Sequence, residues 1–109
     1  MFDLVGDEMT VQQIIEDKLT RVLVPDHLEV INESSNHNVP QGSESHFKVT
    51  LVAKSFENQR LLERHRIVNK ILANELSRGI HALALHTYTE TEWRNRNGDA
   101  PMSPPCSKG

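Results

Sequence analysis

The chain has 109 residues, of which 37% are hydrophobic and 25% are charged, and its formal net charge is −3. This length and composition fit one small globular domain, and no run approaches the roughly 18 apolar residues of a membrane span. The single cysteine, Cys106, excludes an internal disulfide and a zinc module built on several cysteines, and it suits a reducing cytoplasm. The acidic balance argues against a dedicated nucleic-acid binder but does not exclude a local basic patch.

The N-terminal part of the chain predicts a short extension followed by an amphipathic helix. Residues 1–9 are acidic and lack the basic-then-apolar pattern of a secretion signal, so the domain is expected to begin at Thr10. Thr10 and Gln13 match a capping box, which starts a helix. Pro25 is expected to end this helix. Its apolar face is predicted to comprise Val11, Ile14, Ile15, Leu19, Val22 and Leu23.

Two strand-like segments joined by a polar loop come next. The first covers residues 27–33 and the second covers residues 46–53, where apolar and polar residues alternate. The alternation predicts one face of the second strand in the core and the other at least partly exposed to solvent. The loop, residues 34–45, contains Pro40 and Gly42, which break both helices and strand ladders.

The second half of the chain predicts a long helix, a third strand and a short helix. The long helix covers residues 59–77 and ends before Gly79, and a strand covers residues 80–88. Thr89 and Glu92 match a second capping box, which starts the short helix. The remainder, residues 97–109, is proline-rich and predicts a disordered tail. The buried stripe of the long helix is predicted to comprise Leu61, His65, Val68, Leu72 and Leu76.

The element order predicts an α+β fold that gathers three histidines. The first two strands should pair antiparallel, and the second and third, joined through a helix, should pair parallel in a three-stranded mixed sheet with helices over one face. His37, His46 and His81 then meet at one end of the sheet, whereas His86 points to the opposite face from His81. Imidazoles bind zinc, copper or iron, but two are too few for a closed structural site, so a partner or cofactor must supply the rest.

Other chemically interesting residues favour structural roles. His65 is expected to be a neutral, hydrogen-bonded core histidine, and Trp93 is expected to pack the last helix on the sheet. Cys106 is expected to be an inert thiol of the tail. Ser45 and His46 do not predict a hydrolase, because neighbours on an extended segment point to opposite faces and no orienting acid is identifiable.

Two groups of residues in this chain resemble the BolA family. Residues 32–49 resemble the first half of a BolA protein, and residues 64–68 with residues 81–93 resemble the second half. The resemblance implies a BolA fold, similar to the class II KH domain, over residues 10–96. Asn58 stands where the family often has glycine, and asparagine tolerates the positive φ that the turn needs. The Gly-x-x-Gly loop with which KH domains clamp RNA is absent from this sequence.

The resemblance also implies a non-enzymatic function in the cytoplasm. BolA proteins partner monothiol glutaredoxins and share a [2Fe–2S] cluster, whose other ligands are the glutaredoxin cysteine and glutathione. The family's ligand positions fall on His37 and His81, and His46 is expected to be a neighbour or hydrogen-bond partner. Bacterial members are also stress-linked transcriptional regulators that bind promoter DNA and affect cell shape.

A DNA-binding regulator is therefore the alternative interpretation. Its candidate contact residues are Arg60, Arg64, Arg66 and Lys70 of the long helix and Lys48 of the second strand. The structural alternative for these residues is a solvated face or salt bridges with Glu57 or Glu63. An interaction domain without metal is a third interpretation, and a weak homodimer is left open.

Overall fold

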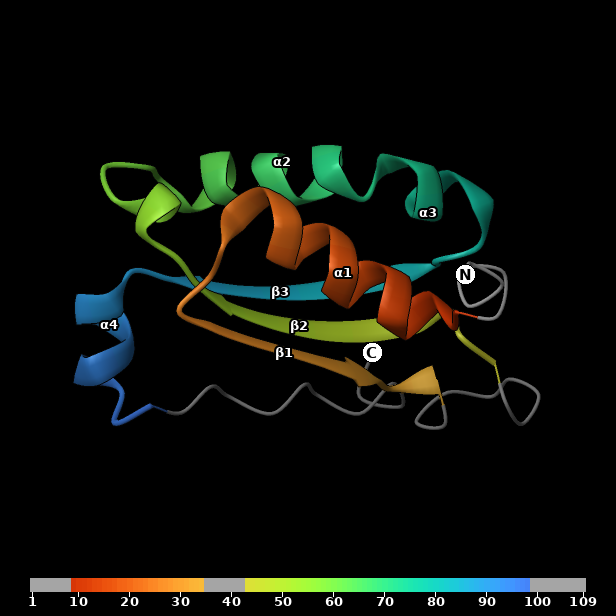
Figure 1. Ribbon diagram of the computed structural model, residues 1–109, viewed down its shortest axis with the longest axis horizontal. Helices are drawn as coiled ribbons and strands as arrows, with labels where there is room; N and C mark the ends of the chain where they lie inside the picture. Colours follow the sequence, from red (N-terminus) through yellow and green to blue (C-terminus); the bar gives the residue numbers. More distant parts are fainter. Residues whose placement is uncertain (1–8, 35–42, 99–109) are drawn as a thin grey trace, which may run out of the picture.

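A computed structural model describes residues 9–34 and 43–98. The three strands form one sheet in the order β1-β2-β3. Helices α1, α2 and α3 lie over one face of this sheet, and α4 lies beyond the end at which β3 finishes (Figure 1). The elements in chain order are α1 (Val11–Leu23), β1 (His27–Asn32), β2 (His46–Val52), the 3-10 turn η3 (Lys54–Phe56), α2 (Leu61–Ile71), α3 (Ala73–Arg78), β3 (Ala82–Tyr88) and α4 (Glu90–Asn95).

Helix α1 begins at the predicted capping box. The backbone N–H of Gln13 donates to Thr10 Oγ1 over 3.1 Å, and the Thr10 N–H donates to Gln13 Oε1 over 2.9 Å. At the other end Val24 takes a left-handed conformation with φ 44°, which is strained for a β-branched residue. Pro25 explains this ending, because a proline disfavours the right-handed helical region for the residue before it.

The predicted strand pairing is confirmed, and β2 is the central strand. Strands β1 and β2 pair antiparallel with Val30 opposite Val49, and β2 and β3 pair parallel with Val49 beside Leu85. The prediction that one face of β2 is partly exposed is wrong. Lys48 and Thr50 are only 7% and 1% exposed. A strand with a neighbour on both sides has its side chains flanked along both edges, so alternation in the sequence does not reveal how deeply the polar face is covered.

The hydrophobic core lies between the sheet and the helices that cover it. Each layer contributes: α1 and α2 bury apolar side chains toward the sheet, and the sheet buries alternate residues toward them. The turn η3 adds Phe56, which is fully buried. The core residues are Ile15, Leu19, Leu23, Val30, Phe47, Val49, Leu51, Ala53, Phe56, Val68, Leu72 and Ile80.

The predicted single long helix is instead two helices separated at Leu72. Leu72 has φ −99° and ψ 17°, which departs from helical geometry. Its N–H still donates to the Val68 carbonyl over 3.0 Å, and its own carbonyl accepts from the Leu76 N–H over 2.9 Å. The two helices are therefore joined by a bend through which helical hydrogen bonds continue. The sequence has no glycine or proline at this position that would predict a bend.

The first turn of α2 also faces the sheet differently from the prediction. Leu61 was expected in the buried stripe but is 58% exposed, whereas Arg64 is only 7% exposed. The buried positions are Arg64, Val68 and Leu72, each four residues from the next. Helical periodicity gives the spacing of a stripe, but it does not decide which of two overlapping stripes meets the sheet.

Turns and caps in the second half agree with the sequence. Asn58 has φ 65°, so it occupies the left-handed turn position expected of it. Thr89 and Glu92 form the predicted capping box at the start of α4. Gly79 caps α3. Within residues 9–34 and 43–98, no helix is long and apolar enough to cross a membrane.

Candidate functional site

His46 and His81 meet at the end of the sheet where β2 and β3 begin. Their ring centroids are 6.1 Å apart and the rings are close to perpendicular. The backbone holds them there, because the His81 N–H donates to the Ser45 carbonyl over 2.7 Å. His81 is exposed to solvent and His46 is half-buried. The prediction that connectivity brings these two imidazoles together is confirmed.

A network of polar residues ties the two sides of this end together. Ser34 Oγ accepts from the backbone N–H groups of Ser45 and His46 over 3.0 Å and 3.1 Å. The Asn32 side-chain amide donates to the Ser43 carbonyl over 3.0 Å. Ser34 is itself buried. Ser34 is therefore tied to the start of β2 and Ser43 to the end of β1, which the sequence did not indicate.

Glu44 connects this end of the sheet to α1. Its carboxylate accepts from the backbone N–H groups of Val11 and Gln12 over 3.1 Å and 3.3 Å. These are N–H groups of the first turn, which have no partner inside their own helix. A carboxylate at a helix N-terminus is also favoured by the helix dipole. The segment that precedes His46 is thereby held against the start of α1.

The described part of the chain offers an incomplete set of metal ligands. His37, the other predicted ligand, lies outside the described residues. Among those that are described, no three His, Cys, Asp or Glu side chains converge on one point. Ser45 Oγ is hydrogen-bonded to His46 Nδ1 over 2.9 Å, so the prediction that these neighbours point apart is wrong. The reason is that Ser45 precedes the strand and does not share its alternation.

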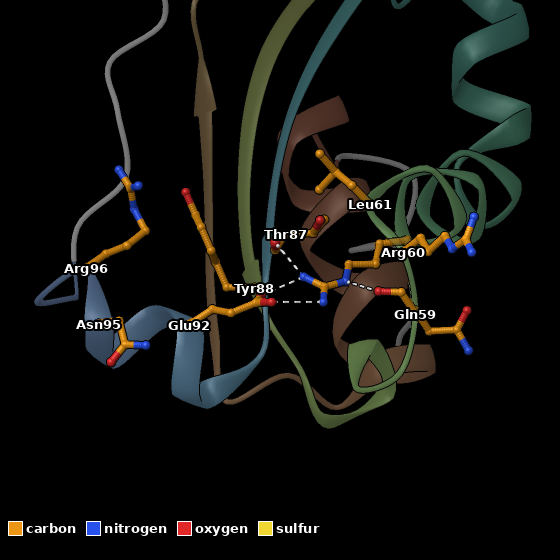
Figure 2. Close-up of a pocket in the computed structure, with 9 residues that line it drawn as sticks. Gln59, Arg60, Leu61, Thr87, Tyr88, Glu92, Asn95 and Arg96 are labelled. Carbon is orange, nitrogen blue, oxygen red and sulfur yellow. Dashed lines mark hydrogen bonds and ion pairs between the residues drawn. The ribbon is translucent and has the colours of Figure 1, made fainter.

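Arg64 forms a buried network at the opposite end of the sheet (Figure 2). Its guanidinium donates to both carboxylate oxygens of Glu92, over 2.7 Å and 3.1 Å. It also donates to the Thr87 carbonyl over 3.1 Å and, through Nε, to the Gln59 carbonyl over 2.9 Å. One side chain therefore joins the segment before α2, the end of β3 and α4. A buried charge requires such pairing.

This network corrects part of the predicted nucleic-acid surface. Arg64 and Lys48 are each only 7% exposed, so neither has the surface that a phosphate contact needs. Arg60, Arg66 and Lys70 are exposed on and beside α2, as expected. The acid that pairs with Arg64 is Glu92, and not Glu57 or Glu63, which are closer to Arg64 in the sequence. Glu92 was recognisable in the sequence only as a capping residue, because no local pattern connects positions 28 residues apart.

Three titratable groups near this network have altered pKa values. Hydrogen bonds from Arg64 lower the pKa of Glu92, so its carboxylate stays charged. Burial, with a smaller effect of Arg64, lowers the pKa of His65 below its ordinary value of 6.5. Burial and then Lys48 lower the pKa of His86 in the same way. His65 is therefore neutral as predicted, but the prediction that it is hydrogen-bonded is wrong, since its buried Nε2 has no partner in the described structure.

Trp93 packs α4 against the sheet, as the sequence predicted. Its ring stacks on His27 of β1 at 4.9 Å between centroids and lies 5.3 Å from the ring of Tyr88 of β3. The two edge strands are thus bridged by one aromatic side chain. Aromatic pairs at these separations contribute beyond the area that they bury.

Comparisons with known proteins agree with this architecture. Residues 19–92 match the family model described as BolA-like protein. The chain belongs to the BolA-like family. It is 54% identical over 99 residues to a Vibrio cholerae protein named DNA-binding transcriptional regulator BolA, covering 91% of this chain and 93% of that protein. An Escherichia coli protein of the same name is 52% identical over 98 residues, covering 90% and 93%.

A solved structure confirms the predicted α+β fold of this BolA-like chain. The solution structure of mouse BolA1 superimposes with a TM-score of 0.79 at 44% identity, covering 90% of this chain and 79% of the mouse protein. The relatives' names describe regulators and BolA-like proteins and do not describe enzymes.

We expect Arg64→Met to destabilise the fold by about 2 kcal/mol, because it removes several buried hydrogen bonds and leaves the Thr87 and Gln59 carbonyls without their donor. Urea unfolding followed by circular dichroism measures this loss. Arg66→Met, on the exposed face of the same helix, is the matched control and should change the free energy of unfolding by less than about 0.5 kcal/mol. Equal effects of the two substitutions would contradict the structural role of Arg64.

We expect the free energy of unfolding to fall as the pH falls below 6.5, partly because of His65. Its pKa is lowered on folding, so at acidic pH the unfolded chain binds more protons than the folded chain and is favoured. His65→Gln cannot titrate, and its stability should decrease less than that of the wild type between pH 7.5 and pH values below 6.5. Urea midpoints measured across this range test the difference, and parallel pH profiles would rule out the contribution of His65.

Proposed function

We propose that this BolA-like chain is a non-enzymatic adaptor that shares a [2Fe–2S] cluster with a monothiol glutaredoxin and glutathione. His81 and His37 are the ligands that it contributes. The observation that supports this proposal best is the exposed imidazole of His81, held beside His46 at the end of the sheet from which the loop containing His37 departs. An incomplete pair of imidazoles fits one half of a shared site, since the other half must come from a partner.

The covalent structure of the chain keeps His37 within reach of this position. Ser34 binds the backbone of His46, and His37 follows Ser34 by three residues. Three residues span at most about 11 Å, so the loop can bring a second imidazole to the same end of the sheet. The hydrogen bond from the His81 N–H to the Ser45 carbonyl meanwhile fixes the backbone of His81 directly before β3, which favours a defined ligand geometry.

The chemistry of the donors also agrees with the proposal. A cluster held partly by imidazole has a higher reduction potential than one held by thiolates alone. This chain must present its imidazoles in the neutral form, so binding should weaken in acid. His46 lies edge-on to His81 and bonds Ser45, which suits a residue that limits the orientation of the ligand ring.

We expect His81→Ala to alter the spectrum of the mixed complex while leaving the fold intact, because His81 is exposed. The measurement is anaerobic reconstitution with a monothiol glutaredoxin and glutathione, followed by visible circular dichroism. Wild-type protein should give a spectrum distinct from that of glutaredoxin alone, and His81→Ala and His37→Ala should each move it toward the glutaredoxin spectrum.

The matched control for this experiment is His86→Ala, which removes an imidazole from within β3, five positions beyond His81. It should preserve the wild-type mixed spectrum. If His81→Ala gives the unaltered wild-type spectrum, His81 is not a ligand. If wild-type protein leaves the glutaredoxin spectrum unchanged, the shared cluster itself is excluded.

A second candidate function, DNA-binding transcriptional regulation, is supported by the names of the Vibrio cholerae and Escherichia coli relatives. The exposed basic side chains of Arg60, Arg66 and Lys70 are the described residues best placed for it. Arg66 and Lys70 are four residues apart, so they project from one face of α2. With a net charge of −3, the chain would depend on such a local patch for contacts with phosphates.

We expect Arg66→Ala to weaken binding of a promoter DNA duplex and to lower the slope of log affinity against log salt by about 1, because one phosphate contact is lost. Fluorescence anisotropy at several salt concentrations measures both. Arg21→Ala removes the same charge from α1 and should leave the slope unchanged. Identical slopes for wild type and Arg66→Ala would remove Arg66 from the DNA surface.

A further inference from the structure

A cleft lies between α1 and α3, at the same end of the sheet as the histidines. Figure 1 shows the start of α1, the end of α3 and the start of β3 at this end. The volume of the cleft is about 250 Å³. We call it the α1–α3 cleft, and its lining includes Ile14, Glu44, Glu75, Arg78, Gly79 and Ile80.

The α1–α3 cleft adjoins the imidazoles through the backbone. Ile80 lines the cleft and directly precedes His81, so their Cα atoms are about 3.8 Å apart. On the other side Glu44 precedes Ser45, whose carbonyl accepts the His81 N–H over 2.7 Å. A protein that brings cluster ligands to His81 therefore has to cover surface directly beside this cleft.

The charges around the cleft leave one cation for a partner. Glu75 forms an ion pair with Lys18 over 2.8 Å. The Glu44 carboxylate accepts hydrogen bonds from two backbone N–H groups in the first turn of α1. Arg78, in contrast, is exposed and forms no ion pair with an acidic side chain of the described residues. A carboxylate of a docked protein would supply the missing counter-charge.

The size and the lining of the cleft favour a protein side chain over a free small molecule. Ile80 is only 6% exposed and Ile14 is half-buried, so part of the lining is apolar. Small-molecule sites usually have volumes of about 300–1,000 Å³, which is more than this cleft offers. Protein interfaces commonly centre on one large side chain that fills a pocket on the other protein.

We propose that the α1–α3 cleft anchors the glutaredoxin, which inserts one large apolar side chain into it and places a neighbouring carboxylate on Arg78. This inference rests on the proposed cluster-sharing function, because that function brings a glutaredoxin to His81. It assigns the affinity for the partner to residues other than the cluster ligands, so docking and ligation can be measured separately.

Gly79 allows the cleft to be filled by a substitution. A Cβ added at Gly79 would meet no atom within 4 Å, so a larger side chain there enters open space at the cleft. We expect Gly79→Leu to bind metal-free monothiol glutaredoxin about tenfold more weakly than the wild type, because leucine occupies the space that the partner needs. Isothermal titration calorimetry measures the affinity. Ser77→Leu is the matched control, since it adds the same side chain to α3 outside the lining and should bind like the wild type.

Arg78→Glu tests the charge at the rim of the same cleft. We expect about tenfold weaker binding of the metal-free glutaredoxin, and the loss should become smaller at high salt because exposed charges are screened. Arg94→Glu makes the same change on an exposed residue of α4, at the other end of the sheet, and should bind like the wild type. Far-UV circular dichroism establishes that each variant is folded, and if Gly79→Leu does not fold, Arg78→Glu decides.

Visible circular dichroism of the reconstituted complex separates this inference from the proposed function. His81→Ala should bind metal-free glutaredoxin like the wild type and still alter the cluster spectrum. The cleft is excluded as the anchor if Gly79→Leu binds as tightly as the wild type, or if Ser77→Leu weakens binding equally. It is also excluded if the mixed cluster spectrum forms although the metal-free proteins do not associate, and in these cases the cluster function stands.

The opposite results would overturn the proposed function. If the metal-free proteins associate and Gly79→Leu weakens them, but no mixed spectrum forms, the shared cluster is wrong and the docking inference stands. If the proteins neither associate nor give a mixed spectrum, both are wrong.

Discussion

The central position of β2 is the constraint on which the rest of this molecule depends. Because β1 and β2 pair antiparallel, the end of β1 lies beside the start of β2. Because β2 and β3 pair parallel, the start of β3 lies at that same end of the sheet. His46 and His81 are neighbours for this reason, although they lie 35 positions apart in the chain. The other end of the sheet holds the end of β3 and α4, where Arg64 pairs with Glu92.

The burial of Arg64 shows how electrostatics and packing act together at that second end. The charge of an arginine residue that is only 7% exposed is tolerable because a carboxylate and two backbone carbonyls accept its hydrogen bonds. The same contacts hold α4 to α2 and lower the pKa of Glu92. A residue that resembles a free basic side chain in the sequence is therefore part of the scaffold, and the surface charge lies on its neighbours Arg60 and Arg66.

The proposed activities use different parts of one small domain. The imidazoles lie where β2 and β3 begin, and the exposed cations of the second candidate function lie on and beside α2. Substitutions of His81 and of Arg66 therefore test the two proposed functions separately.

Local sequence signals determined the caps, the alternating strands and the sheet topology. Thr10 and Thr89 predict the starts of two helices, because a capping box involves residues that are only three positions apart. The pairing of Arg64 with Glu92 and the burial of Lys48 were decided only by tertiary structure. Each depends on what packs against a residue from far along the chain, and no spacing within one element encodes that.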